Sequence, residues 1–95
     1  MQKYHKLLIE SKRSRRVGNH RVEVFGKSRY YYYHGHLVCH VDEVGDYPIF
    51  ELDACGYSEY RSTKMCLAGY REYYSNKGYK EINPIKIFKY EEDKK

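Results

Sequence analysis

Hydrophobic and polar residues alternate through the middle of the chain with the two-residue period of half-buried strands. Residues 20–25 (HRVEVF) show this period, and the tyrosine run at 29–33 suits a pleated surface because aromatic side chains favour strands. Short segments that contain glycine separate most of these runs, as they do in hairpins. The pattern predicts strands at 20–25, 29–33, 36–42, 47–54 and 85–90.

One segment has helical spacing instead. It begins at Ser62 or Thr63, either of which can cap a helix, and it ends at 76–78, where Gly78 suits the position just after the last turn. Residues 3–10 (KYHKLLIE) fit either one helical turn or a short strand with Tyr4, Leu7 and Leu8 facing inward. The apolar side of the main helix is predicted to be Cys66, Leu67, Tyr70, Tyr73 and Tyr74.

Together these elements predict an α+β fold. We expect an antiparallel sheet of four to five strands, arranged as a meander, with one main α-helix packed on one face. A chain of 95 residues is too short to divide its core, so residues 1–95 should form a single domain. Residues 11–19 (SKRSRRVGN) are predicted to be a basic loop and residues 91–95 a frayed tail.

The turn lengths decide which side chains share a face of the sheet. The turn at 26–28 could hold two residues or three. With three, the valines of 20–25 share a face with Tyr30 and Tyr32, whereas with two they share it with Arg29 and Tyr31. A slip of one residue reverses every side chain, so the apolar pattern favours the three-residue turn. The predicted core face, which the helix covers, is Val22, Val24, Tyr30, Tyr32, Leu37, Cys39, Val41, Phe50, Leu52 and Ala54.

The opposite face is predicted to be open, because no second helix of adequate length exists to cover it. Three interpretations of this face remain: tyrosines that only shield the sheet, a protein interface anchored by tyrosine and arginine, or a surface that stacks nucleic-acid bases. Its predicted residues are Arg21, Glu23, Phe25, Arg29, Tyr31, Tyr33, His36, Val38 and His40.

Composition adds a basic character to this picture. Only 41% of the residues are apolar, and that share includes 13 tyrosines, so tyrosine rings must supply much of the core. The net charge of +5 favours an anionic partner, although it also serves solubility alone. The basic run at 12–16 could contact phosphates or form a solvated loop. The candidate binding residues combine this run with the open face: Arg13, Arg15, Arg16, Arg21, Arg29, Tyr31, Tyr33, His36 and His40.

Catalysis, metals and cofactors are not indicated by any motif. The three cysteines argue against a disulfide framework, because their number is odd and no signal peptide precedes them. His34, His36, Cys39 and His40 lack the spacing of a tetrahedral metal site. No serine or cysteine lies in a nucleophile signature. We therefore expect no enzyme activity, no cofactor and no metal site. No stretch approaches the roughly 20 apolar residues of a membrane span, so a cytoplasmic protein is expected.

Three motifs resemble a group of short, uncharacterised proteins of bacteriophages and related mobile elements: YYYYHGHLVC (30–39), ELDACGY (51–57) and STKMCL (62–67). The resemblance implies a phage protein that inhibits a complex in the bacterial host cell. A nucleic-acid-directed defence effector such as a CRISPR–Cas complex is one such target. Strong net basicity disfavours mimicry of DNA, so occlusion of a surface is expected instead.

The expected partner is therefore a host protein or ribonucleoprotein complex. The alternative function is an accessory protein that binds RNA or DNA through the basic loop and the Tyr/Arg face. An exposed strand edge or the tyrosine face could also pair with a second copy of the chain, forming a homodimer.

Overall fold

The computed structural model describes residues 2–43, 45–52 and 61–84. These residues form one sheet in the order β1-β2-β3-β4-β5-β6, in which all neighbours are antiparallel except β5 and β6. The α+β meander is therefore confirmed, with six strands rather than four or five. The strand predicted at 85–90, the tail at 91–95 and Ala54 lie outside the described residues. In chain order the elements are α1 (Lys3–Ile9), β1 (Arg15–Val17), β2 (His20–Phe25), β3 (Ser28–Tyr33), β4 (His36–Asp42), β5 (Ile49–Leu52), α2 (Arg61–Asn76) and β6 (Lys80–Glu81).

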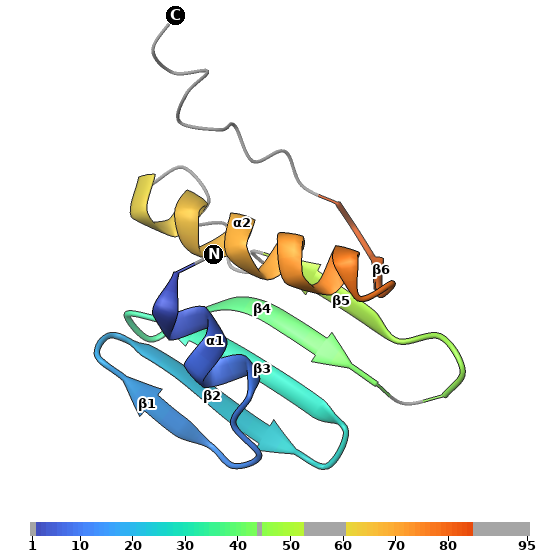
Figure 1. The fold of residues 1–95 in the computed structure, drawn as a ribbon, viewed down its shortest axis with the longest axis horizontal. Coiled ribbons are helices and arrows are strands. Elements are labelled where there is room, and N and C mark those ends of the chain that lie inside the picture. Colours follow the sequence, from blue (N-terminus) through green and yellow to red (C-terminus); the bar gives the residue numbers. More distant parts are fainter. Residues whose placement is uncertain (1, 44, 53–60, 85–95) are drawn as a thin grey trace, which may run out of the picture.

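Both helices lie on the same side of the sheet (Figure 1). The short helix α1 packs over β1 and β2, and the longer helix α2 packs over β4, β5 and β6. The core fills the space between these two layers. The inward side predicted for the main helix is confirmed, because Cys66, Leu67, Tyr70 and Tyr74 are buried and Tyr73 packs against them. The buried apolar residues are Leu8, Val22, Tyr31, Val38, Cys39, Val41, Phe50, Leu52, Cys66, Leu67, Tyr70 and Tyr74.

The β2–β3 turn holds two residues, so the predicted three-residue turn is wrong. Phe25 pairs with Ser28, and Gly26 has a φ of 58° at the first of the two central positions, which is the arrangement of a type II′ hairpin turn. Val22 therefore pairs with Tyr31 and not with Tyr32. Consequently β3 presents its side chains to the faces opposite to those predicted.

A bulge in β4 restores the predicted faces of the later strands. The turn at His34-Gly35 has two residues, both with positive φ, and it pairs Tyr32 with Leu37. Tyr31 then pairs with Cys39, so Val38 is an extra residue with no partner of its own. Val38 is buried, and the prediction that it lies on the open face is wrong.

The predicted basic loop contains a strand. Residues 15–17 form β1, which pairs antiparallel with β2 and is one edge of the sheet. The backbone of Val24 also donates to the Ser14 hydroxyl at 3.0 Å, which continues the connection past the end of β1. Arginine-rich composition hid this strand, although charged residues are common on strand edges.

The end of α2 positions the last described strand. Gly78 has a φ of 90°, and its N–H donates to the Ser75 carbonyl at 3.0 Å, as in a helix C-terminus that closes through a glycine. The chain then turns back, and the Lys80 N–H donates to the Pro48 carbonyl at 3.1 Å. This contact places β6 parallel to β5 at the edge of the sheet.

Candidate functional site

The face of the sheet opposite the two helices is the candidate site, and we call it the outer face. None of the described helices packs on it. Directly paired residues share a face, so the strand register identifies its members. They are Arg16, Arg21, Glu23, Phe25, Ser28, Tyr30, Tyr32, Leu37, His40, Asp42, Ile49 and Glu51.

Three rings on the outer face pack against one another. Tyr30 stacks on His40 with ring centroids 4.6 Å apart and an angle of 6° between the ring planes. Phe25 meets Tyr30 edge to face at 5.8 Å, and 62% of its surface is exposed. The Tyr30 ring is therefore in contact with two neighbouring rings, whereas Phe25 projects as an apolar group into solvent.

Tyr32 is covered by an arginine from the next strand. The Arg21 guanidinium lies 4.2 Å from the Tyr32 ring centroid, and its Nε is 3.7 Å from a carboxylate oxygen of Glu23. Burial and the Glu23 carboxylate, which also forms a hydrogen bond with the Tyr32 side chain, raise the pKa of Tyr32, so its hydroxyl is neutral. A cation–π contact of this kind holds the exposed guanidinium flat on the sheet.

Acidic and basic side chains are mixed across the outer face. Glu23, Asp42 and Glu51 lie on it together with Arg16 and Arg21. The Glu51 carboxylate accepts a hydrogen bond from the Asn83 side chain at 2.8 Å. The outer face thus has no single sign of charge, and it combines rings, guanidinium groups and carboxylates.

Two of the predicted binding residues are part of the core. Tyr31 is fully buried, and its hydroxyl is 2.6 Å from the Tyr74 hydroxyl. Arg29 donates from Nε to the Tyr31 hydroxyl at 2.8 Å and from one NH2 group to the carbonyls of Leu8 and Ser11, both at 2.7 Å. Burial raises the pKa of Tyr31 to about 12. Both residues stabilise the junction of α1 with the sheet, so their predicted place on the open face is wrong.

Tyr33 and His36 also lie on the helix side. Tyr33 pairs with His20 on β2, and the two rings stack at 4.5 Å. The stack continues to Tyr4 of α1, whose ring lies 3.6 Å from that of His20. His36 pairs with Tyr33 across the tight turn and is exposed. The predicted surface therefore divides, and only Arg16, Arg21 and His40 among the nine predicted residues lie on the outer face.

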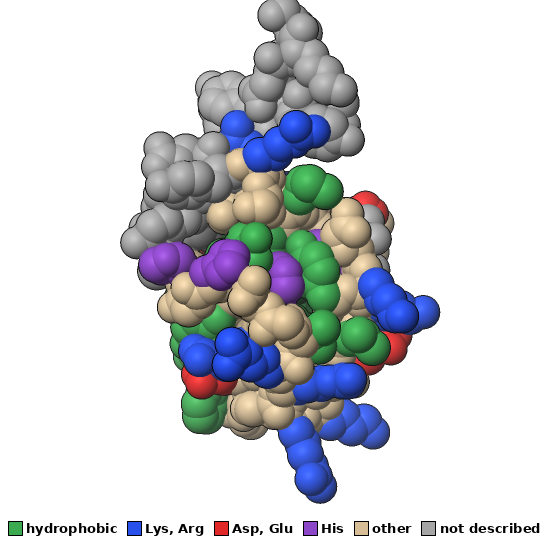
Figure 2. Space-filling view, turned by 90° about the vertical axis from the view of Figure 1, so that its left-hand side faces the viewer, with side chains coloured by type: hydrophobic (Ala, Val, Ile, Leu, Met, Phe, Trp, Pro, Cys, Tyr) green, Lys and Arg blue, Asp and Glu red, His purple; other side chains and the backbone are tan. Residues whose placement is uncertain are grey.

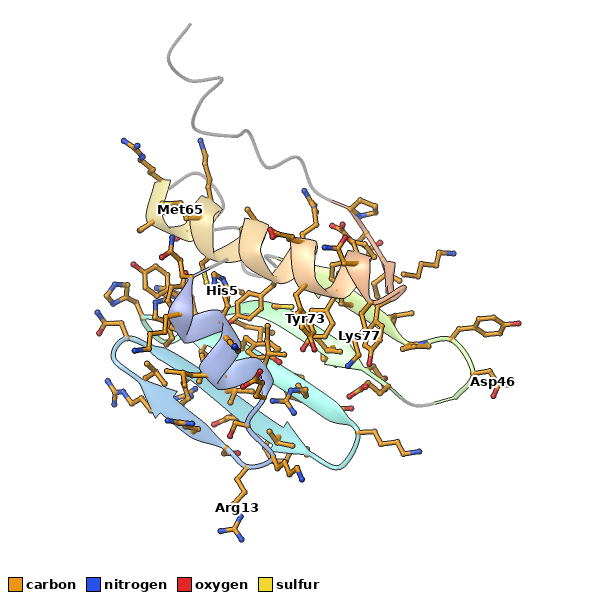
Figure 3. All side chains as sticks on the ribbon, in the orientation of Figure 1. His5, Arg13, Asp46, Met65, Tyr73 and Lys77 are labelled. Atoms are coloured by element: carbon orange, nitrogen blue, oxygen red, sulfur yellow. The ribbon has the colours of Figure 1, made fainter. Side chains whose placement is uncertain are left out.

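Arg13 and Arg15 complete the nine. Both are exposed, and Figure 3 shows Arg13 extending into solvent away from the sheet and helices. Arg15 pairs with Val22 and so lies on the helix side of β1, whereas the adjacent Arg16 lies on the outer side. The basic run therefore points to both sides of the edge strand.

Tyr30, Tyr32 and Leu37 are the outer-face residues that the sequence analysis wrongly assigned to the core face, and Leu37 follows Tyr32 because the two are paired. The glycine at position 26 is the signal that could have found them, because glycine is preferred at the first central position of a two-residue type II′ turn. A two-residue turn reverses the assignment of every β3 side chain.

The described cysteines do not form a reactive site. Burial raises the pKa of the Cys66 thiol to about 12 and that of the Cys39 thiol well above its usual range. A thiol held neutral in this way is a poor nucleophile. Cys55 lies outside the described residues.

In the described part of the chain, no group of three or more His, Cys, Asp or Glu side chains is arranged to hold a metal ion. None of the described helices is long and apolar enough to cross a membrane.

Comparison with known proteins gives no counterpart: no family model, no curated protein and no solved structure matches the chain.

Proposed function

We propose that this domain binds another protein through its outer face and acts by covering a surface of that partner. The observation that carries the proposal is the exposed Phe25 ring, supported from below by the Tyr30–His40 stack. An aromatic group that projects from a rigid base is a typical anchor for a pocket on a partner. Tyr32 and Arg21, which lie further along the same face, belong to the residue types that dominate binding energy at protein interfaces.

The packing of the rings favours a protein partner over stacked bases. A sheet that binds single-stranded nucleic acid offers flat, free ring faces to successive bases. Here one face of the Tyr30 ring is stacked on His40, Phe25 packs against the same ring edge to face, and Arg21 lies over a face of Tyr32. A base would have to displace one of these contacts before it could stack.

The charges of the outer face support the same choice. Three carboxylates on the face would repel the phosphates of a nucleic acid laid across it. A protein surface, in contrast, can offer both signs of charge and can pair with Arg21 and Glu51 at different points. Mixed charge therefore supports specific recognition of a protein.

The resemblance to short phage proteins supplies a biological setting for this activity. Under the proposal, the domain inhibits a complex in the bacterial host, with a nucleic-acid-directed defence effector as the leading candidate. Inhibition would follow from occlusion, because a rigid sheet face can block a surface without any chemistry. The partner would supply an apolar pocket for Phe25 and carboxylates that pair with Arg21.

Capture from host extract with matched variants tests the proposal. Wild-type protein should retain a defined partner, and Phe25→Ser should lose it with a fall in affinity of at least tenfold, which is a loss of about 1.4 kcal/mol. Met65→Ser is the matched control, since Met65 is also an exposed apolar residue (38%) but lies on α2, on the other side of the sheet (Figure 3). It should bind the partner like the wild type.

The same two variants also test whether binding inhibits the partner. A purified complex of the captured partner should be inhibited by wild type and by Met65→Ser, but not by Phe25→Ser. Equal binding by all three proteins would exclude the outer face as the docking surface. Binding without inhibition would exclude occlusion of a working surface.

A further inference from the structure

The positive charge of this protein is concentrated in its N-terminal part. Residues 1–36 contain nine Lys and Arg side chains against two Asp and Glu, whereas residues 37–95 contain nine against eleven. The first part therefore carries a net charge of +7 and the second a net charge of −2, from a total of +5. Charge that only keeps a domain soluble can be spread evenly along the chain, whereas here the positive charge is concentrated in the first 36 residues.

The fold keeps these cations together at one edge of the sheet. The first part forms α1, β1, β2 and β3, which are neighbours in space because α1 packs over β1 and β2. Figure 2 shows Lys and Arg side chains spread over the lower half of this side of the molecule, with few acidic side chains among them. A concentrated positive field therefore surrounds the β1 edge.

The edge cations are not neutralised by the protein itself. Lys12, Arg13, Arg15 and Arg16 are all exposed. None of the four forms an ion pair with a carboxylate of the described residues, and the Arg16 Nε donates only to the Gly18 carbonyl at 3.0 Å. Four unpaired charges within five residues repel one another, and this repulsion is relieved when a polyanion binds.

From this arrangement we infer that the β1 edge binds the phosphodiester backbone of a nucleic acid, at a surface that shares only Arg16 with the outer face. Arginine suits this ligand, because its guanidinium donates two parallel hydrogen bonds to a phosphate. Arg15 and Arg16 point to opposite sides of β1, so the edge can contact a strand that passes along it from either side. The same charges facing their own copies disfavour pairing of two β1 strands into a dimer.

The binding is independent of base sequence. Phosphate contacts position a protein on a nucleic acid but do not identify bases. Arginine supplies two of the three side chains of β1, and the rings of the adjacent outer face already pack on their neighbours. The edge therefore supplies general affinity, which suits a partner complex that itself holds RNA or DNA.

Salt dependence of binding tests this inference with the isolated protein. Fluorescence anisotropy of labelled 20-nucleotide RNA, and of a DNA duplex of the same length, is measured between 25 and 300 mM NaCl, which are about the concentrations over which phosphate contacts are lost. Arg13→Gln/Arg15→Gln removes two edge charges and leaves Arg16 of the outer face intact. Lys77→Gln/Lys80→Gln is the matched control, because it removes the same charge from the α2–β6 region.

The edge variant should bind RNA roughly tenfold more weakly at low salt, and its slope of log K against log salt should fall by about 1.4. The control should lose much less affinity, and Arg13→Lys/Arg15→Lys should largely keep it. An equal loss in both charge variants would mean that net charge alone attracts nucleic acid, and it would overturn the inference. Absence of binding at 25 mM salt, or equal binding to polyglutamate, would overturn it too.

This result is independent of the proposed function. The assay contains no protein partner, and the edge variant keeps Phe25, Tyr32 and Arg21. Loss of nucleic-acid binding with capture of the protein partner unchanged would separate the two surfaces.

Discussion

Tyr70 and Tyr74 lie one turn apart in α2, and both rings are buried in the core. The Tyr74 hydroxyl is 2.6 Å from that of Tyr31, but the Tyr70 hydroxyl has no hydrogen-bond partner among the described residues. A buried hydroxyl without a partner costs the free energy of its lost hydration, while its ring still contributes apolar contact. The two tyrosines therefore differ in what their oxygen atoms contribute.

Removal of these oxygens one at a time should have opposite effects on stability. Tyr70→Phe should leave the free energy of unfolding unchanged or raise it by up to about 1 kcal/mol, because it deletes an unsatisfied group. Tyr74→Phe should lower it by about 1 kcal/mol, because Tyr31 loses a partner in the core. Urea denaturation of the two variants measures both values. If Tyr70→Phe were the more destabilising change, the Tyr70 hydroxyl would have a partner after all.

Several core residues could not be predicted from their own types. His5 and Arg29 are polar, and their places depend on partners far away in the chain: the Cys66 carbonyl for His5 and the Leu8 and Ser11 carbonyls for Arg29. Only the folded arrangement brings these acceptors within reach. Cys66 and Leu67 were predicted correctly, because an apolar helical stripe is a local signal.

Helices α1 and α2 are joined by a close contact at a glycine. A Cβ atom added to Gly69 would lie 2.3 Å from the His5 ring, and that ring is fully buried. The His5 Nε2 is 2.7 Å from the Cys66 carbonyl, so the imidazole cannot move away without losing a buried hydrogen bond. Gly69 is therefore required for the close approach of the two helices.

Gly69→Ala should destabilise the protein although alanine is the better helix former. The steric cost of a larger group in a filled core, about 1–3 kcal/mol, exceeds the gain of about 1 kcal/mol in helix propensity. Thermal unfolding followed by circular dichroism measures the loss. In a His5→Ala background the obstructing ring is gone, so the same change should become neutral or stabilising. An equal loss in both backgrounds would show that the two residues are not coupled.

Arg29 ties the end of α1 to the sheet. Its guanidinium donates to the Leu8 carbonyl in the last turn of this seven-residue helix, to the Ser11 carbonyl just after the helix, and to the Tyr31 hydroxyl. Arg29→Met keeps the apolar stem but removes these three hydrogen bonds. We expect the free energy of unfolding to fall by about 2 kcal/mol, as is typical when hydrogen bonds to a charged group are lost.

Arg21→Met is the control for this effect. Arg21 lies on the outer face, and its ion pair with Glu23 is exposed, so its removal should change stability by less than about 0.5 kcal/mol. A hydrogen-exchange comparison should also show faster exchange of the α1 amides in Arg29→Met alone. Similar losses from both substitutions would contradict an anchoring role for Arg29.

At the level of elements, local patterns predicted β2, β3, β4, β5 and α2 but not their relative register. Alternation identifies a strand, whereas the face that it presents depends on turn length and on bulges. The turn at Gly26 has one residue fewer than predicted, which reversed the face assignments within β3. The bulge in β4 adds one residue, so the predicted faces of Cys39 and Val41 are correct. The edge strands β1 and β6 were missed because their residues lack alternation and depend on a neighbour.

At the scale of the whole molecule, the charge distribution was predicted better than the site. The basic run was visible in the sequence, and the fold keeps it at one edge. The composition of the open face depended on the register, so Tyr31 and Tyr33 were expected where Tyr30 and Tyr32 lie. The open face does combine aromatic rings with arginines, as predicted, but its tyrosines are Tyr30 and Tyr32.

Two histidines, the buried His5 of α1 and the half-buried His20 that stacks on Tyr4 of α1, make the whole fold sensitive to acid. The His5 Nδ1 accepts from the Gln2 N–H at 3.0 Å, so its neutral form is the one that fits, with the proton on Nε2. Burial lowers the pKa of His5, and burial together with the nearby His5 and His34 lowers the pKa of His20 to about 4. Both rings lie between α1 and the rest of the fold, so protonation opposes the packing of this layer.

Stability should therefore fall on acidification. The unfolded chain binds protons at histidine near pH 6.5, above the folded pKa values, so the stability that these groups contribute is complete above pH 6.5 and is lost as the pH falls toward about 4. The Tm should decrease between pH 7.5 and pH 5.0, a window chosen because carboxylates titrate mainly below it, near pH 4. His20→Gln removes one of the two groups and should make the decrease smaller while it leaves the fold intact. A Tm that is independent of pH in the wild type, or a decrease of the same size in His20→Gln, would contradict this role for the Tyr4–His20 stack.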